Sequence, residues 1–343
     1  MVKKRLIYFD ILKIICMLFV IYNHSWWYFE GHGKLFITFK FTVFCFSKMA
    51  VPIFLMITGA LMLKKDTSYN EILKKRIPRI YIGMLSATIF GCIFFKLNYK
   101  TMLIRSIFGS QTSVNLYWLW YIYLLITLYL LTPFIKKITN NFNERDYKNF
   151  FIIFLILPSC VFYFSNFSEL ALGKYKLMEN LFEQLLYLTY IGYYVFGYYI
   201  SNKKISPKLN KRAIICNIVG YLLGMLYLTV GYKHTHEPVE LFNNTIVTVF
   251  MSTSTFISFK YYYENLNVKP CVSKIILLLS ESNFGIYLFH LYLVEYLIKT
   301  KFIIGLIKYN VFLGYFTMIF MTYFILATVF YFIRKISIFK KIY

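Results

Sequence analysis

Apolar stretches of about 20 residues recur along this chain, with short polar connections between them. A helix needs about 20 residues to cross the roughly 30 Å hydrocarbon core of a bilayer. Hydrophobic residues make up 59% and charged residues 15% of the 343 residues, whereas an ordinary soluble domain is about 45–50% apolar and about 25% charged. The pattern therefore predicts an all-α integral membrane protein. It leaves no room for a separate soluble domain within residues 1–343.

We expect a single bundle of about ten transmembrane helices. The expected spans cover approximately residues 6–29, 35–63, 79–95, 116–135, 149–165, 185–200, 213–231, 242–260, 275–298 and 311–333. In this topology about 25 of the 38 Lys and Arg residues fall on one set of alternate connections and about 10 on the other. Because basic residues favour cytoplasmic loops, both termini are expected in the cytoplasm of a multi-pass protein of the cell membrane.

The formal charge of +24 does not by itself indicate a nucleic-acid partner. A nucleic-acid binder carries its basic patch on a soluble face, whereas these charges lie where loops meet the membrane surface. We therefore expect membrane lipids, and no nucleic acid, among the partners. The six cysteines stand singly, without the paired spacing of a metal site or a disulfide framework, so no metal is expected.

Three ionisable residues occupy the first expected span: Asp10, Lys13 and His24. Ionisable groups inside a membrane cost a few kcal/mol each and usually mark function. In a continuous helix the step from Lys13 to His24 is three turns plus about 20°, and Asp10 lies within about 60° of both. This stripe predicts a polar path. In the alternative interpretation, Asp10 and Lys13 form an interfacial ion pair and His24 only packs in the bundle.

The imidazole of His24 suits acyl transfer. With an ordinary pKa near 6.5, a histidine can take the proton of a sugar hydroxyl while that hydroxyl attacks a thioester carbonyl. It could equally become acylated itself. Both mechanisms need a neutral imidazole close to the reacting carbonyl, so the sequence leaves the general base and the acyl carrier open.

Further charged residues are candidates for binding. Arg76 and Arg79, around Ile77 and Pro78, carry guanidinium groups that suit phosphate oxygens, although a plain cluster of cytoplasmic basic residues is the simpler alternative. His290 could bind substrate or satisfy a partner in the bundle. Lys48 adds a charge to the second span, where it could support the site.

The first span, from Arg5 through Asp10 and Lys13 to His24, resembles the opening of the membrane acyltransferase-3 family, whose pattern is a basic residue, ten residues and a histidine. Arg76-Ile-Pro-Arg79 resembles the family's second pattern, two arginines separated by two residues. Segments 51–60, 119–133, 197–199 and 285–290 are also similar to it, so the resemblance covers nearly the whole chain. Lys13 departs from the arginine that is common in relatives, and lysine lacks the planar fork of arginine.

The resemblance implies a membrane O-acetyltransferase that moves an acetyl group from cytoplasmic acetyl-CoA to a hydroxyl of a cell-surface glycan. It implies that His24 is catalytic, that Lys13 places the donor or holds the histidine, and that Arg76 and Arg79 engage coenzyme A. A capsule polysaccharide, an exopolysaccharide or a lipid-linked saccharide is the expected acceptor. Asp10, Lys48 and His290 remain candidates for support or substrate binding.

Two other functions fit a polar stripe in a membrane bundle. A saccharide transporter or flippase also needs charged residues along its pathway, but the half-helices broken by Gly or Pro that are typical of such proteins do not appear as a repeated pair. A membrane-sensing component without chemistry of its own is the third possibility. It predicts that acylation survives the loss of His24.

Overall fold

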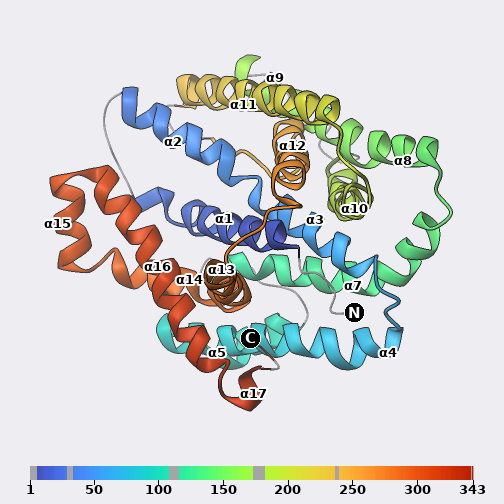
Figure 1. Cartoon of the computed structure of the whole chain (residues 1–343). Coiled ribbons are helices and arrows are strands. Elements are labelled where there is room, and N and C mark those ends of the chain that lie inside the picture. The colour runs from blue at the N-terminus through green and yellow to red at the C-terminus, as the bar shows by residue number, and fades with distance from the viewer. Residues whose placement is uncertain are drawn as a thin grey trace. The chain divides into compact units, whose positions relative to one another are not determined.

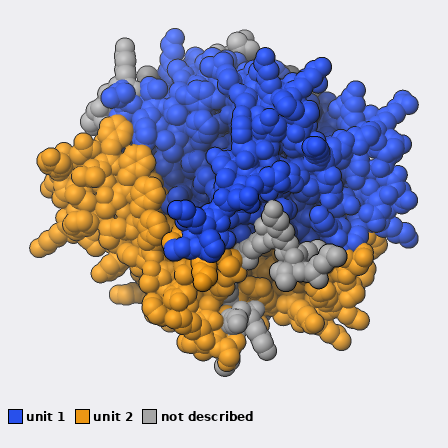
Figure 2. All heavy atoms as spheres, in the orientation of Figure 1, with its two compact units in different colours: residues 1–23, 30–65, 136–273 blue, residues 24–29, 66–135, 274–343 orange. Residues whose placement is uncertain are grey.

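Helices make up all the regular structure of the described part of the chain (Figure 1). This computed structural model describes residues 6–28, 34–107, 116–172, 182–235, 239–340 and 342. The chain divides into two compact units, coloured separately in Figure 2. Unit 1 contains residues 1–23, 30–65 and 136–273, and unit 2 contains residues 24–29, 66–135 and 274–343. The predicted all-α class is confirmed.

Unit 1 is built from helices of both the first and the middle part of the sequence. Its elements are α1 (Ile7–Asn23), α2 (Lys34–Ser47), α3 (Ala50–Met62), α8 (Glu144–Phe151), the π-helical η4 (Ile152–Ile156), α9 (Leu157–Leu172), α10 (Phe182–Ser201), α11 (Pro207–Thr235) and α12 (Ile246–Tyr263). Helix α3 packs against α1, α10 and α12, so it lies at the centre of this unit.

Unit 2 combines the short segment after α1 with the fourth to seventh α-helices and the C-terminal helices. Its elements are η1 (Trp26–Tyr28), α4 (Tyr69–Glu71), the π-helical η2 (Ile72–Arg76), α5 (Ile77–Phe94), α6 (Tyr99–Ile107), η3 (Tyr117–Leu119), most of α7 (Trp120–Thr139) and of α13 (Pro270–Glu281), α14 (Asn283–Leu297), α15 (Lys301–Tyr309), α16 (Val311–Ile333) and α17 (Ser337–Lys340). Helix α14 packs against both α5 and α16.

Six helical segments of the described chain are long and apolar enough to cross a membrane. They are Leu35–Met62, Tyr69–Phe94, Tyr117–Thr139, Glu144–Ser168, Pro207–Thr235 and Val311–Ile333. The pair α13 and α14, bent by 59° between them, makes a seventh if it forms one span. All seven coincide with spans predicted from the sequence.

The other three predicted spans form helices α1, α10 and α12, which are shorter or less apolar than the seven candidate spans. Helix α1 has 17 residues, α10 is rich in tyrosine, and α12 contains several serines and threonines. A polar helix can still cross a membrane inside a bundle, where its polar side chains face other helices. The count of about ten spans and the cytoplasmic termini stay predictions.

Two glycines bring α3 and α10 into contact through their backbones. A Cβ at Gly59 would lie 1.8 Å from the carbonyl oxygen of Tyr194, and one at Gly197 would lie 2.0 Å from that of Met56. Small residues at such crossings let helices approach closely, which strengthens packing where the lipid supplies no hydrophobic driving force. Two glycines of α11 also lie in close contacts: Gly220 faces α12, and Gly224 faces Cys45 of α2 and Val247 of α12.

Aromatic side chains hold α14 between its neighbours in unit 2. The hydroxyl of Tyr292 donates to the backbone carbonyl of Ala87 on α5 at 2.8 Å. On the other side the ring of Phe330 on α16 covers Gly285, where a Cβ would lie 2.4 Å from the ring. Helix α14 is therefore firmly placed within unit 2, and it carries the predicted site residue His290.

Candidate active site

Lys13 and Asp10 form an ion pair on α1. Lys13 Nζ lies 3.3 Å from Asp10 Oδ1, and the Asp10 carboxylate is almost fully buried. This is the i, i+3 pair that the alternative interpretation of the sequence described. Helix α1 ends at Asn23, and His24 lies in the turn that follows it. The predicted stripe on one continuous helix therefore stops one residue before the histidine.

Two hydrogen bonds connect the end of α1 to the end of α2 within unit 1. Asn23 Nδ2 donates to the carbonyl of Ser47 at 3.1 Å, and Ser47 Oγ donates to Asn23 Oδ1 at 2.7 Å. Ser47 is fully buried. These reciprocal bonds fix the end of α1 within unit 1, and Asn23 directly precedes His24 in the sequence. The sequence contained no signal that would have paired Asn23 with Ser47.

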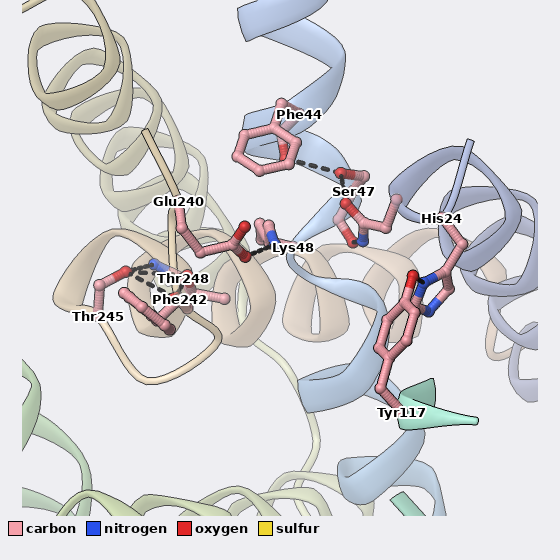
Figure 3. A network of polar contacts seen from close by, with 10 residues as sticks. His24, Phe44, Ser47, Lys48, Tyr117, Glu240, Phe242, Thr245 and Thr248 are labelled. Atoms are coloured by element: carbon pink, nitrogen blue, oxygen red, sulfur yellow. Dashed lines mark hydrogen bonds and ion pairs between the residues drawn. The ribbon is translucent and has the colours of Figure 1, made fainter. Parts of the chain in front are cut away.

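Lys48 follows Ser47 and is buried against an acidic partner. Its ammonium forms an ion pair with Glu240 and lies 4.4 Å from the centre of the Phe44 ring (Figure 3). The sequence left the partner of Lys48 unknown, because Glu240 is distant in the chain. A buried ammonium that is paired in this way has a structural role that needs no substrate.

His24 belongs to unit 2, where it contacts His290, which the sequence predicted, and Tyr117, which it did not. Its Nδ1 lies 3.0 Å from the hydroxyl oxygen of Tyr117, close enough for a hydrogen bond (Figure 3). The imidazole rings of His24 and His290 have their centroids 5.0 Å apart. The structure thus brings the two histidines of the prediction together and adds Tyr117, which the sequence analysis missed.

His290 is fully buried, with a fixed tautomer. Its Nδ1 lies 2.7 Å from the carbonyl oxygen of Tyr287, so Nδ1 carries the proton and donates it. The opposite atom, Nε2, therefore presents a lone pair. No hydrogen-bond partner for Nε2 exists among the described residues. A buried polar atom without a partner is uncommon and calls for an explanation, such as a substrate atom.

Trp118 completes the group. Its ring centroid lies 6.3 Å from that of His290, and its backbone carbonyl accepts a hydrogen bond from the hydroxyl of Tyr287. The indole Nε1–H is buried and, like His290 Nε2, has no partner in the described structure. We call these five residues, His24, Tyr117, Trp118, Tyr287 and His290, the histidine cluster. It presents one unsatisfied donor and one unsatisfied acceptor.

The two arginines of the second motif follow a π-helical turn. The N–H of Ile77 bonds to the carbonyl of Ile72, five residues back, and Pro78, which has no N–H, comes next. Arg76 ends the π turn and Arg79 lies in the first turn of α5. A wide turn of this kind is frequently found at functional sites.

Each of these arginines has a partner in unit 2. Arg76 binds the carboxylate of Glu71 through Nη2 at 2.8 Å and Nε at 3.2 Å. Arg79 donates from Nε to the carbonyl of Ile342 at 3.2 Å. Glu71 orients the fork of Arg76, and guanidinium groups of this kind suit anionic oxygens. The sequence contained no signal that would have paired Glu71 with Arg76 rather than with a neighbouring lysine.

Among the described residues, no group of three or more His, Cys, Asp or Glu side chains could hold a metal ion. The histidine cluster presents imidazole, phenol and indole groups.

A chain of hydrophobic helices with a buried histidine is typical of a multi-pass membrane protein with a site inside its bundle. The chain belongs to the acyltransferase-3 family, since the model of that family, described as an acyltransferase domain, matches residues 6–332. No curated protein and no solved structure matches the chain. The resemblance found in the sequence is confirmed, and the chain is a membrane acyltransferase. Family membership favours the transferase over the transporter and over the sensor.

Proposed function

We propose that this protein is an O-acetyltransferase of the cell membrane that transfers an acetyl group from cytoplasmic acetyl-CoA to a hydroxyl of a cell-surface polysaccharide or a lipid-linked saccharide. The observation that carries the acceptor class is the pair of unsatisfied atoms, His290 Nε2 and Trp118 Nε1. A hydroxyl both donates and accepts hydrogen bonds, so a sugar with several hydroxyls satisfies both atoms. The acetyl group itself rests on the family resemblance.

His24 is the general base in this proposal. Its Nδ1 carries the ring proton and donates it to the hydroxyl oxygen of Tyr117, so that the lone pair of Nε2 takes the proton of the acceptor hydroxyl. The hydroxyl oxygen bonds to the thioester carbon, the carbon–sulfur bond breaks, and coenzyme A leaves as a thiolate that takes up a proton. Tyr117 holds the ring in place, as the orienting group does in other catalytic histidine systems.

The donor side is assigned to Arg76 and Arg79. Both lie where the predicted topology places a cytoplasmic loop, and coenzyme A carries phosphate groups that match guanidinium forks. Glu71 orients Arg76 for this contact. Lys13, held by Asp10, and Lys48, held by Glu240, support unit 1 in this proposal, because each has a carboxylate partner of its own.

The test is the O-acetyl content of surface polysaccharide, measured by NMR in cells that lack the gene. Complementation uses wild type, His24→Ala and His234→Ala at matched expression. His234 is an exposed histidine on α11 and serves as the control. We expect acetylation to return with wild type and with His234→Ala, and to stay absent with His24→Ala. Normal acetylation with His24→Ala contradicts the assignment of the base, and unchanged acetylation without the gene contradicts the function.

A second measurement separates the base from the acyl carrier. Purified protein is incubated with radiolabelled acetyl-CoA in the absence of acceptor and then analysed for label on the protein. A general base predicts no covalent label. Covalent label that appears on the wild-type protein and is lost in His24→Ala would instead indicate an acyl-histidine intermediate.

A further inference from the structure

A pocket of 250 Å³ lies in unit 2 between α13 and the last turns of α16. Three of its lining side chains are cationic, namely Lys274, Arg334 and Lys335, and one, Glu281, is acidic. Two leucines of α13 and the ring of Tyr331 supply apolar walls. None of these residues belongs to the histidine cluster. We call this the α13–α16 pocket.

The positive charge of the pocket is only partly neutralised. Arg334 forms an ion pair with Glu281. Lys274 makes no ion pair with any described residue, and the ammonium of Lys335 lies over the Tyr331 ring at 4.5 Å rather than against a carboxylate. Three cationic groups against one carboxylate leave the pocket with a net positive charge. This charge favours an anionic ligand, because the mutual repulsion of the two ammonium groups falls when an anion binds between them.

The pocket lies within electrostatic range of the donor motif. Arg79 experiences the positive charges of both Arg76 and Arg334, and Arg334 lines the pocket. The cationic groups of the donor motif and of the pocket therefore belong to one neighbourhood of unit 2. Coenzyme A carries its charge at two places, the diphosphate and the 3′-phosphate of the ribose. At 250 Å³ the pocket is smaller than typical sites for whole ligands, which occupy about 300–1,000 Å³, so it suits one end of a molecule.

We propose that the α13–α16 pocket binds the 3′-phosphate of the coenzyme A donor, with Lys274 and Lys335 as its ligands, while Arg76 and Arg79 bind the diphosphate. This inference rests on the proposed function, because it assumes a coenzyme A thioester as donor. A 3′-phosphate is a dianion near neutral pH and outweighs the single carboxylate of the pocket. Tyr331, at the pocket wall, offers an aromatic face to the adjacent adenosine.

The test compares acetyl-CoA with 3′-dephospho-acetyl-CoA as donors for the purified full chain in phosphatidylcholine vesicles. Wild type is expected to show a KM about tenfold lower for acetyl-CoA, the effect of one charge-assisted contact. Lys274→Ala and Lys335→Ala should lose this preference by raising the KM for acetyl-CoA alone. Lys274→Arg should retain it. Lys208→Ala, an exposed lysine of another expected cytoplasmic loop, should behave as wild type.

Three outcomes overturn the inference in distinguishable ways. Equal preference in wild type and both alanine variants removes the pocket from donor binding while leaving the proposed function intact. An effect of the variants that is equal for both donors, and that appears only when anionic phosphatidylglycerol is added to the vesicles, assigns the pocket to a lipid headgroup instead. If the wild-type protein neither binds nor uses either donor, both this inference and the proposed function are wrong.

Discussion

The imidazole rings of His24 and His290 lie 5.0 Å apart, although the two residues come from opposite ends of the chain. His24 follows the first helix, and His290 lies on α14. Only His24 has a hydroxyl neighbour at Nδ1, whereas His290 donates its Nδ1 proton to a backbone carbonyl and presents Nε2. This difference in environment is the basis on which the proposed mechanism gives the two histidines different roles: base for His24, and contact with the acceptor for His290.

Replacement of His290 by Asn tests that division. The Asn amide can still donate to the Tyr287 carbonyl but has no atom at the position of Nε2. We expect the KM for the acceptor to rise about tenfold, the cost of one lost hydrogen bond, with a smaller change in kcat. Steady-state kinetics with a soluble acceptor saccharide measures both. A fall in kcat of about a hundredfold or more at unchanged KM would instead identify His290 as the base.

Tyr117→Phe removes the hydroxyl that binds His24 and leaves the ring. We expect kcat to fall about tenfold while the KM for acetyl-CoA stays unchanged, because the imidazole loses its orientation but not its chemistry. Tyr187→Phe is the matched control, since Tyr187 is 71% exposed. Equal activity of both variants would show that the bond to Tyr117 does not position His24.

Arg79→Ala and Arg76→Lys test the donor site. Lysine keeps the charge of Arg76 but not the fork that binds Glu71. Each change should raise the KM for acetyl-CoA about tenfold and leave the KM for the acceptor unaltered. Arg145→Ala, on the exposed first turn of α8, is the control for the loss of a basic residue. Donor affinity that is unchanged in both variants would remove these arginines from the site.

Gly59→Ala tests the backbone contact between α3 and α10. A methyl group 1.8 Å from the Tyr194 carbonyl forces the helices apart, and we expect destabilisation of at least about 2 kcal/mol. Gly305→Ala is the matched control, because nothing lies within 4 Å of a Cβ at that position. It should be neutral or stabilise α15 by up to about 1 kcal/mol. Thermal unfolding of the detergent-solubilised protein measures both. Equal melting temperatures would contradict the close packing.

The sequence predicted the positions of the helices because membrane helices are specified locally. A span must satisfy its own backbone hydrogen bonds and must be apolar over about 20 residues, and both conditions are visible in a short window. The seven candidate spans coincide with predicted ones for this reason. The same local reasoning failed at the end of the first helix, because the chain leaves the helix before His24, where Asn23 bonds to Ser47.

Some residues of the candidate site could be identified from the sequence, and others could not. His24, His290, Arg76 and Arg79 were identifiable in the sequence, since charged or ionisable groups in apolar surroundings are costly and therefore conspicuous. Their partners were not. Tyr117 and Trp118 belong to a chain with 33 tyrosines and 4 tryptophans, in which no single aromatic residue attracts notice.

Residue type and hydrophobic period thus determined the class of this protein, the placing of its helices and the candidates for its site residues. The tertiary structure decided which groups meet: His24 with Tyr117 and His290, Arg76 with Glu71, and Lys48 with Glu240. The physical reason is that a hydrogen bond or ion pair depends on distances of about 3 Å between atoms. Such distances between helices are set by packing, at positions such as Gly59 and Gly197, and not by the pattern along any one helix.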